Sequence, residues 1–291
     1  MAFGQPAHQP EMEVPVCPRH PDRPSYVRCQ RCGRPACPEC QRSAAVGVQC
    51  VDCVAETNRA LPVHRTSLGG RVRDGKPMVT YTLIGLCLAV YVLQLVFPGV
   101  QDALAYNGLY TGSEPWRMLT STFLHSQGFL MHIAFNMYAL FIIGRILEPM
   151  LGRARFLALY LLAGFGGSVA VLLINPYSWV VGASGAVFGL FGALLVVTRA
   201  RGGNYRPILL LLGINLAIGF IPGTNIAWQA HVGGLAAGAA LAAVFVYAPR
   251  GPRRAAFQWA GVVVVAAVLL GLAWLGWQNV LQDVAERYAS V

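Results

Sequence analysis

The sequence predicts an all-α membrane protein that crosses the bilayer seven times and begins with a small metal-binding module. The first observation is composition: hydrophobic residues make up 56% of the chain and charged residues only 12%, about half the charged share of an ordinary soluble domain. The second is a change near residue 78, because seven of the eight cysteines precede this point and long apolar runs follow it. We therefore expect two modules joined by a linker.

The change of composition along the chain predicts five segments. Polar residues over 1–15 predict a flexible N-terminus, and the cysteines predict a zinc-binding module over 16–56. A basic linker follows over 57–77. The apolar runs predict a six-span membrane core over 78–248, and then a seventh transmembrane helix with a short extracytoplasmic tail over 249–291.

The predicted zinc module contains four short motifs, CPRH, CQRC, CPEC and CVDC, separated by 8, 4 and 9 residues. Disulfide bonds are the alternative, but the charge pattern described below places this module in the reducing cytoplasm, where disulfides are rare. One histidine among cysteines also favours a metal, because imidazole and thiolate both bind tetrahedral Zn²⁺. Eight ligands are enough for two structural zinc ions. The predicted ligands are Cys17, His20, Cys29, Cys32, Cys37, Cys40, Cys50 and Cys53.

The four motifs resemble B-box-type and related cross-braced zinc fingers. This resemblance implies that the first and third motifs share one zinc ion and that the second and fourth share the other. Sequential pairing is the alternative that the spacing leaves open. A segment this short cannot bury a sufficient apolar core, so we expect the metals to hold it together. We expect the module to be structural or to bind a cytoplasmic protein partner.

Seven apolar runs approach the roughly 20 residues that a membrane-spanning helix needs. The fourth and fifth runs are short, and the second contains polar and charged residues. The runs are 79–97, 129–150, 155–174, 182–198, 207–222, 227–248 and 256–277.

Basic residues predict the orientation of these spans. They precede the first span and occupy the loops between spans two and three, four and five, and six and seven. The loops 175–181 and 222–226 contain none, and the long loop 98–128 contains only Arg117. Cytoplasmic loops carry the excess of Lys and Arg, so we expect a cytoplasmic N-terminus and an extracytoplasmic C-terminus.

Because the charge of +10 is divided among loops, we expect no nucleic-acid partner. The abundance of Arg, Ala and Gly favours a bacterial cell membrane.

Four polar side chains lie inside the predicted spans: His132, Asn136, Ser184 and His231. Each has an ordinary structural explanation. A serine can bond its own helix, a histidine at a span end can be a packing residue, and His132 and Asn136 can bond each other at a spacing of four residues. Spans two, four and six, however, all run inward from the outer side, and the four residues lie near the outer start of each. A shared depth favours a common function.

The chemistry of these side chains suits hydrolysis of an acyl bond. A serine hydroxyl becomes a nucleophile when a nearby base takes its proton, and His231 can be the base for Ser184. Donors from His132 and Asn136, together with the N–H of Ser184, can stabilise the oxyanion that forms.

Glycines surround the same positions. Gly182 and Gly185 flank Ser184 and leave room for a substrate backbone. Gly234 and Gly238 form a small-residue face, which allows span six to approach span four.

The chain resembles the rhomboid family of intramembrane serine proteases over about residues 78–248. The motifs that carry the resemblance are GASG at 182–185, AHVGG at 230–234, HIAFN at 132–136, Trp116-Arg117 in the first external loop and GRILEPMLGRARF at 144–156. Each motif is short, but their order and spacing together are specific. The seventh span is an addition to the six-span rhomboid core.

This resemblance implies that Ser184 is the nucleophile and His231 its general base, without an acidic third member or a catalytic cofactor. It implies that His132 and Asn136 complete the oxyanion hole and that the Trp116-Arg117 loop shapes the core. Transmembrane segments of other proteins would be the substrates. Phe188 is a departure, because many members carry a tyrosine beneath the catalytic histidine, but ring stacking can survive this change.

Two alternatives remain. A catalytically silent rhomboid-like protein would bind membrane clients without cutting them, although it need not keep both Ser184 and His231. A transporter or channel would line a path with buried polar groups, but no Asp or Glu lies in the middle of any predicted span.

Overall fold

The computed structural model describes residues 14–60, 66, 68–70, 76–221 and 226–289. The chain divides into two units, Met1–Val63 and His64–Val291, each with its own contacts. Most of the predicted flexible N-terminus, up to residue 13, lies outside the described residues, and so does much of the basic linker.

The first unit consists of short strands and turns around its cysteines. Strand β1 (Val16–Cys17) pairs antiparallel with β2 (His20–Pro24), and β3 (Gln41–Ser43) pairs antiparallel with β4 (Val48–Cys50). One 3₁₀ turn, η1 (Pro38–Cys40), precedes β3, and the helix α1 (Val51–Ala60) follows β4. The buried core of this unit is Ala36 and six cysteines, so the predicted metal ligands form most of its interior.

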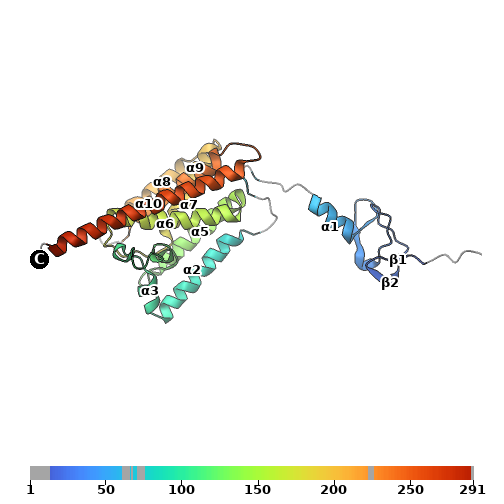
Figure 1. Cartoon of the computed structure of the whole chain (residues 1–291), viewed down its shortest axis with the longest axis horizontal. Helices are drawn as coiled ribbons and strands as arrows, with labels where there is room; N and C mark the ends of the chain where they lie inside the picture. The colour runs from blue at the N-terminus through green and yellow to red at the C-terminus, as the bar shows by residue number, and fades with distance from the viewer. Residues whose placement is uncertain (1–13, 61–65, 67, 71–75, 222–225, 290–291) are drawn as a thin grey trace, which may run out of the picture. The chain divides into compact units, whose positions relative to one another are not determined.

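The second unit is a helical bundle (Figure 1). Its seven apolar helices, in the part of the chain that the structure describes, are α2 (Met78–Val96), α5 (Leu130–Leu151), α6 (Arg153–Ile174), α7 (Ser184–Ala200), α8 (Arg206–Ile218), α9 (Trp228–Tyr247) and α10 (Arg254–Ala289). Four short helical pieces connect α2 to α5: α3 (Gly99–Leu104), η2 (Gly108–Tyr110), α4 (Arg117–Thr120) and η3 (Ser121–Phe123).

Each predicted span corresponds to one of these helices, and the chain is a polytopic membrane protein. Five helices are long and apolar enough to cross a membrane, whereas α7 and α8 have only 17 and 13 residues. Helix α7 begins at Ser184 rather than at 182, because Gly182 has φ +128° and cannot be part of a helix. Helix α10 continues to Ala289, beyond the predicted end at 277. Its added turns pack Val280 and Val284 against the bundle.

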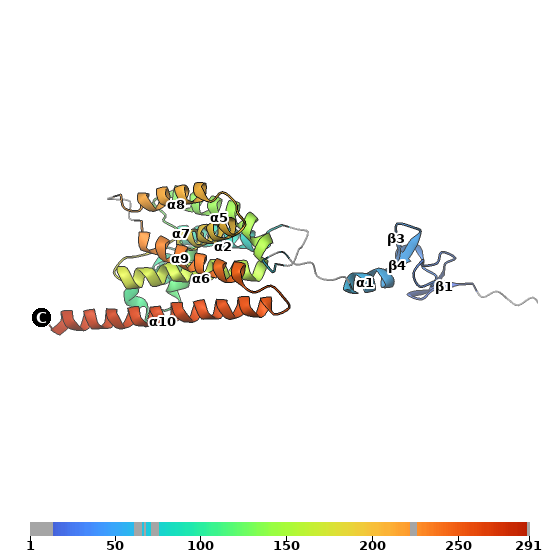
Figure 2. The same ribbon diagram turned by 90° about the horizontal axis from the view of Figure 1, so that it is seen from above.

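Helices α6, α7 and α9 occupy the middle of the bundle. Figure 2 shows α8 on one side of this group and α10 on the other. The backbones of α7 and α9 nearly touch: an added Cβ at Gly234 would lie 1.9 Å from the carbonyl oxygen of Gly185, and one at Gly238 would lie 2.1 Å from that of Gly189. The predicted small-residue face between spans four and six is therefore confirmed.

Buried polar contacts fix the end of the bundle at which α2 begins. The carboxylate of Glu148 on α5 accepts hydrogen bonds from the N–H groups of Val79 (3.0 Å) and Thr80 (2.8 Å), which have no partner inside α2. Nearby, Leu68 is buried, and its carbonyl oxygen accepts a hydrogen bond from Gln258 of α10 (3.2 Å). The described end of the linker is thus packed against the bundle.

Candidate active site and metal-binding groups

Ser184 is the first residue of α7, and the segment before it is held by main-chain bonds. The N–H of Gly182 donates to the carbonyl oxygen of Ser121 (2.9 Å), and Val180 pairs with Tyr106 through two bonds of 3.1 and 2.8 Å. The first N–H groups of a helix have no partner within it and carry partial positive charge. The main-chain N–H of Ser184 is therefore placed to bind a developing negative charge.

His231 lies in the first turn of α9 and is only 7% exposed. Its ring stacks on Phe188, with centroids 4.1 Å apart and planes 7° from parallel. Phe188 follows Ser184 by four residues, so both side chains lie on one face of α7. An added Cβ at Gly185 would lie 3.2 Å from the carbonyl oxygen of Ala230. The structure thus brings His231 to the face of α7 that carries Ser184, and ring stacking is retained with Phe188.

The Nδ1 atom of His231 is buried and has no hydrogen-bond partner among the described residues. In a catalytic triad, a carboxylate would bind at this nitrogen. No ion pair within the described residues involves His231. Among the described residues, His231 therefore has no acidic partner.

His132 lies near the start of α5, with its ring edge against the segment before Ser184. Its Nδ1 accepts a hydrogen bond from the N–H of Ser126 (3.2 Å). A neutral imidazole that accepts at Nδ1 carries its proton on Nε2. An added Cβ at Gly182 would lie 2.8 Å from this Nε2, so the N–H donor of His132 lies beside Gly182, two residues before Ser184.

Asn136 lies one turn after His132 and is 7% exposed. Its amide nitrogen donates to the main-chain carbonyl of His132 (2.8 Å). The two residues are thus bonded to each other across one turn, through the main-chain carbonyl of His132, and no bond joins their side chains in the described part of the chain. Because an amide nitrogen has two N–H groups, the second remains for a ligand.

The predicted metal ligands form two groups, Cys17, His20, Cys37 and Cys40, and Cys29, Cys32, Cys50 and Cys53, and in each group the ligand atoms lie within 4.8 Å of one another. This arrangement agrees with the cross-braced pairing rather than the sequential one. Both groups could hold a metal ion.

The distances within these groups suit a tetrahedral ion. Metal–sulfur bonds of about 2.3 Å place two sulfur ligands about 3.8 Å apart, and the Sγ atoms of Cys32 and Cys50 are 3.7 Å apart. In the other group, the Nδ1 of His20 lies 3.2 Å from the Sγ of Cys37 and 3.4 Å from that of Cys40.

The thiols of the first group cannot easily all ionise without a cation. A hydrogen bond from the main chain of Cys37 lowers the pKa of Cys17 to about 6, whereas burial and then the neighbouring Cys17 raise the pKa of Cys40 to about 11. A bound dication would stabilise both as thiolates.

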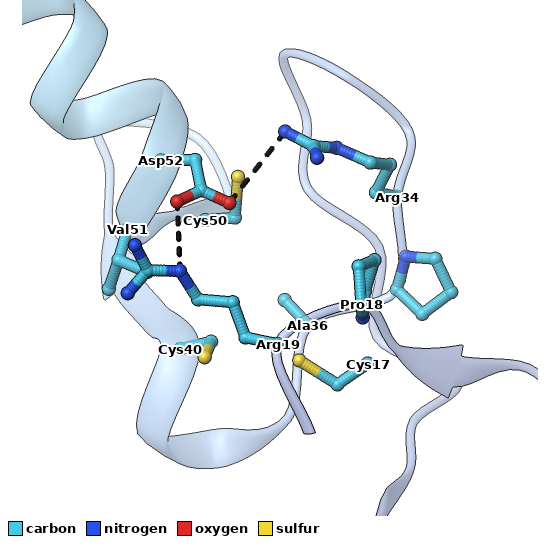
Figure 3. A pocket seen from close by; sticks show the side chains of 10 residues that line it. Cys17, Pro18, Arg19, Arg34, Ala36, Cys40, Cys50, Val51 and Asp52 are labelled. Carbon is cyan, nitrogen blue, oxygen red and sulfur yellow. Dashed lines mark ion pairs between the residues drawn. The ribbon is translucent and has the colours of Figure 1, made fainter. Parts of the chain in front are cut away.

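Ion pairs connect the two groups. Figure 3 shows a pocket between them, in which Asp52 pairs with Arg19 (2.9 Å) and Arg34 (3.8 Å). The Nε of Arg34 also donates to the Sγ of Cys32 (3.4 Å). These contacts are exposed and add little stability, but they place basic side chains beside the thiol ligands.

Comparison with known proteins decides the family. Residues 112–248 match the rhomboid domain. The chain is 38% identical over 139 residues to the putative rhomboid protease YdcA of Bacillus subtilis, and the match covers 46% of this chain and 68% of YdcA. The chain belongs to the rhomboid family.

Two further rhomboid relatives extend the comparison. Rhomboid protease GluP of Bacillus subtilis is 35% identical in an alignment of 240 residues that covers 74% of this chain. Rhomboid protease AarA of Providencia stuartii is 28% identical in an alignment of 235 residues that covers 67% of this chain and 81% of AarA. The chain spans only 45% of the length of GluP. The matched rhomboid domain contains the four candidate catalytic residues, and the cysteine module lies outside it.

In this rhomboid chain, Arg117 organises the loop between α2 and α5. Its guanidinium is buried, pairs with Glu114 (2.7 Å), donates to the carbonyl oxygens of Asp102 and Ala105, and lies 4.7 Å from the ring centroid of Tyr110. Trp116 is 52% exposed. The side chain of Arg117 therefore organises the loop, and the expected role of this loop in shaping the core stays a prediction.

The sequence reasoning did not single out His125. Its ring is fully buried, lies 5.3 Å from the ring of His132, and has no hydrogen-bond partner at either nitrogen among the described residues. The sequence did offer one signal, because His125 precedes the candidate residue His132 by only seven positions.

Proposed function

We propose that this rhomboid protein is an intramembrane serine endopeptidase that uses Ser184 and His231. The observation that carries the proposal is the stacking of a buried histidine on Phe188, four residues after a serine that begins a helix. Two relatives of this chain are named rhomboid proteases, GluP and AarA, and they support the same reaction.

The residues have the following roles in this proposal. His231 takes the proton from the Oγ of Ser184 as the oxygen attacks the carbonyl carbon of the scissile peptide bond. Donors from the N–H of Ser184, the Nε2 of His132 and the amide of Asn136 bind the oxyanion. His231 then gives the proton to the leaving amine, and water hydrolyses the ester that remains on Ser184.

Transmembrane segments of other proteins are the proposed substrates. The candidate residues lie at the starts of α5, α7 and α9, at the end of the bundle opposite the arginine-bearing turns between helices. By the distribution of basic residues, that end is extracytoplasmic and the N-terminus is cytoplasmic. Cleavage would then take place near the outer membrane surface.

Zinc is the proposed metal of the two cysteine-containing groups, because sets of three or four thiolates with at most one imidazole select Zn²⁺ at tetrahedral sites. Each ion would hold together segments distant in sequence. The closed ligand sets leave no position for a substrate, so the role is structural. A cytoplasmic protein partner of the module is part of the same proposal.

A cleavage assay in liposomes tests the proposed function. The purified full chain is reconstituted with a membrane-spanning reporter that has small residues near its outer end, and the products are located by mass spectrometry. We expect a cut within or beside the transmembrane segment. Binding of the reporter by the folded protein without any cut would instead support a silent client-binding protein.

Replacing Asn136 by alanine should lower kcat for the reporter by about 10²-fold, the usual cost of one oxyanion donor. The matched control is Asn215→Ala in α8. Asn215 makes the same bond to its own helix, to the carbonyl of Leu211 (2.8 Å), but is not part of the candidate site. Equal kcat values for the two variants would remove Asn136 from the proposed oxyanion hole.

A further inference from the structure

Helix α10 presents one apolar stripe to the end of the bundle that contains the candidate site. The stripe consists of Ala273, Trp277, Val280 and Val284, which repeat at intervals of four and three residues. It joins a buried cluster that includes Val180, four residues before Ser184, and Ala230, next to His231. The stripe therefore belongs to the same apolar cluster as one residue shortly before Ser184 and one residue directly before His231.

The approach of α10 to this cluster is close. An added Cβ at Gly112, in the loop between α2 and α5, would lie 2.4 Å from the ring of Trp277. An added Cβ at Gly276 would lie 2.9 Å from the side chain of Leu172 on α6. Because both contacts have a glycine, α10 can lie close against the bundle, and the interface between α10 and the bundle is tightly packed.

Polar groups continue this contact beyond the stripe. The hydroxyl of Tyr177, in the segment between α6 and α7, donates to the carboxylate of Asp283. Arg287 pairs with Asp283 (3.2 Å) and lies 4.9 Å from the ring centroid of Tyr177. Two residues of α10 thus hold the side chain of Tyr177.

The connecting segment, defined as residues 175–183, leads directly into Ser184. It is also bonded to the loop between α2 and α5. The amide of Asn107 donates to the carbonyl of Tyr177 (2.9 Å), and the N–H of Gly108 donates to the carbonyl of Pro176 (2.7 Å). The segment is therefore held by α10 and by that loop.

We propose that α10 is a positioning element for the nucleophile, with Trp277, Tyr177 and Asp283 as its positioning residues. The apolar stripe and the Tyr177–Asp283–Arg287 contact fix the connecting segment, and the segment fixes Gly182 and the start of α7. Release of α10 displaces Ser184 from the base and the oxyanion donors without unfolding the bundle. This inference rests on the proposed serine protease function.

The test compares Trp277→Ala with Trp274→Ala. Trp274 lies three residues earlier on α10 and is 62% exposed, so it is a matched control of the same residue type. Each variant of the full chain, reconstituted in liposomes, reacts with a fluorophosphonate under pseudo-first-order conditions. The end point gives the fraction of competent sites, and the rate constant gives the reactivity of each site. Hydrogen exchange of residues 175–183 is measured on the same samples.

We expect Trp277→Ala to react about ten-fold more slowly, to the wild-type end point, and to exchange faster over residues 175–183. Trp274→Ala should match the wild type, and Trp277→Phe should recover most of the rate. A lower end point with an unchanged rate constant would mean that Trp277 only stabilises the fold, and would overturn the proposal.

The outcome for the wild type separates this inference from the proposed function. If the wild type does not react at all, the proposed serine chemistry fails. Hydrogen exchange then decides whether α10 holds the segment: faster exchange in Trp277→Ala supports that contact, and unchanged exchange contradicts it. A reactive wild type with an equally reactive Trp277→Ala overturns only the role of α10.

Discussion

Replacing either Ser184 or His231 by alanine is expected to abolish cleavage of a membrane-spanning reporter, with a loss of at least about 10⁴-fold in kcat. Without the Ser184 hydroxyl no covalent intermediate can form. In the proposed mechanism the hydroxyl keeps its proton without His231, the base that stacks on Phe188 beside α7. In that mechanism the two residues act as one unit, so the double variant should be no slower than either single variant.

Ser168→Ala is the matched control for this prediction. Ser168 is buried, and its hydroxyl already donates to the carbonyl of Met118 (2.7 Å). The control is expected to lose some thermal stability but to keep its kcat per folded molecule. If His231→Ala kept a rate within ten-fold of the control, the general base would have to be another residue.

Removal of metal is expected to unfold the first unit of the chain and to leave the helical bundle folded. The physical reason is the composition of the core, which is Ala36 and six cysteines. Once the metals leave, this unit has almost no apolar interior, and thiolates packed together repel one another. Structural zinc contributes about 10–16 kcal/mol in small zinc-binding units, more than the total stability of most domains.

Hydrogen exchange on the full chain measures this effect. The purified protein should contain two zinc ions per chain, and a strong chelator should increase exchange over residues 14–60 to nearly unfolded rates, while α5, α6 and α9 keep their protection. Cys37→Ala should lose zinc from one site, whereas Cys87→Ala, in the buried interior of α2, should keep both ions. Exchange over residues 14–60 that does not respond to the chelator would contradict a metal-dependent fold.

Much of the fold follows from the sequence because hydrophobic periodicity and basic loops are local signals. The ranges of α2, α6 and α9 agree with the predicted spans within about two residues. The start of α7 could not be placed, because it depends on the φ of +128° at Gly182, where an added Cβ would lie 2.8 Å from the ring of His132, a residue distant in sequence. The length of α10 was underestimated, because its polar last turns are held by Tyr177, which is distant in sequence.

The candidate site divides in the same way. Ser184, His231, His132 and Asn136 were recognised from short motifs, and the structure places them at adjoining helix starts. The tautomer of His132 could not be predicted, since it depends on the N–H of Ser126. The contacts of Trp277 with Gly112 required a tertiary structure, because no periodic pattern relates residues so far apart.

The most direct test of the central claim is to locate the reactive side chain. The full chain in liposomes is treated with a fluorophosphonate, which reacts only with an activated hydroxyl, and the modified residue is identified by mass spectrometry. The account predicts a single adduct on Ser184, and none in His231→Ala. An adduct on another residue, or labelling of Ser184 at the wild-type rate in His231→Ala, would contradict it.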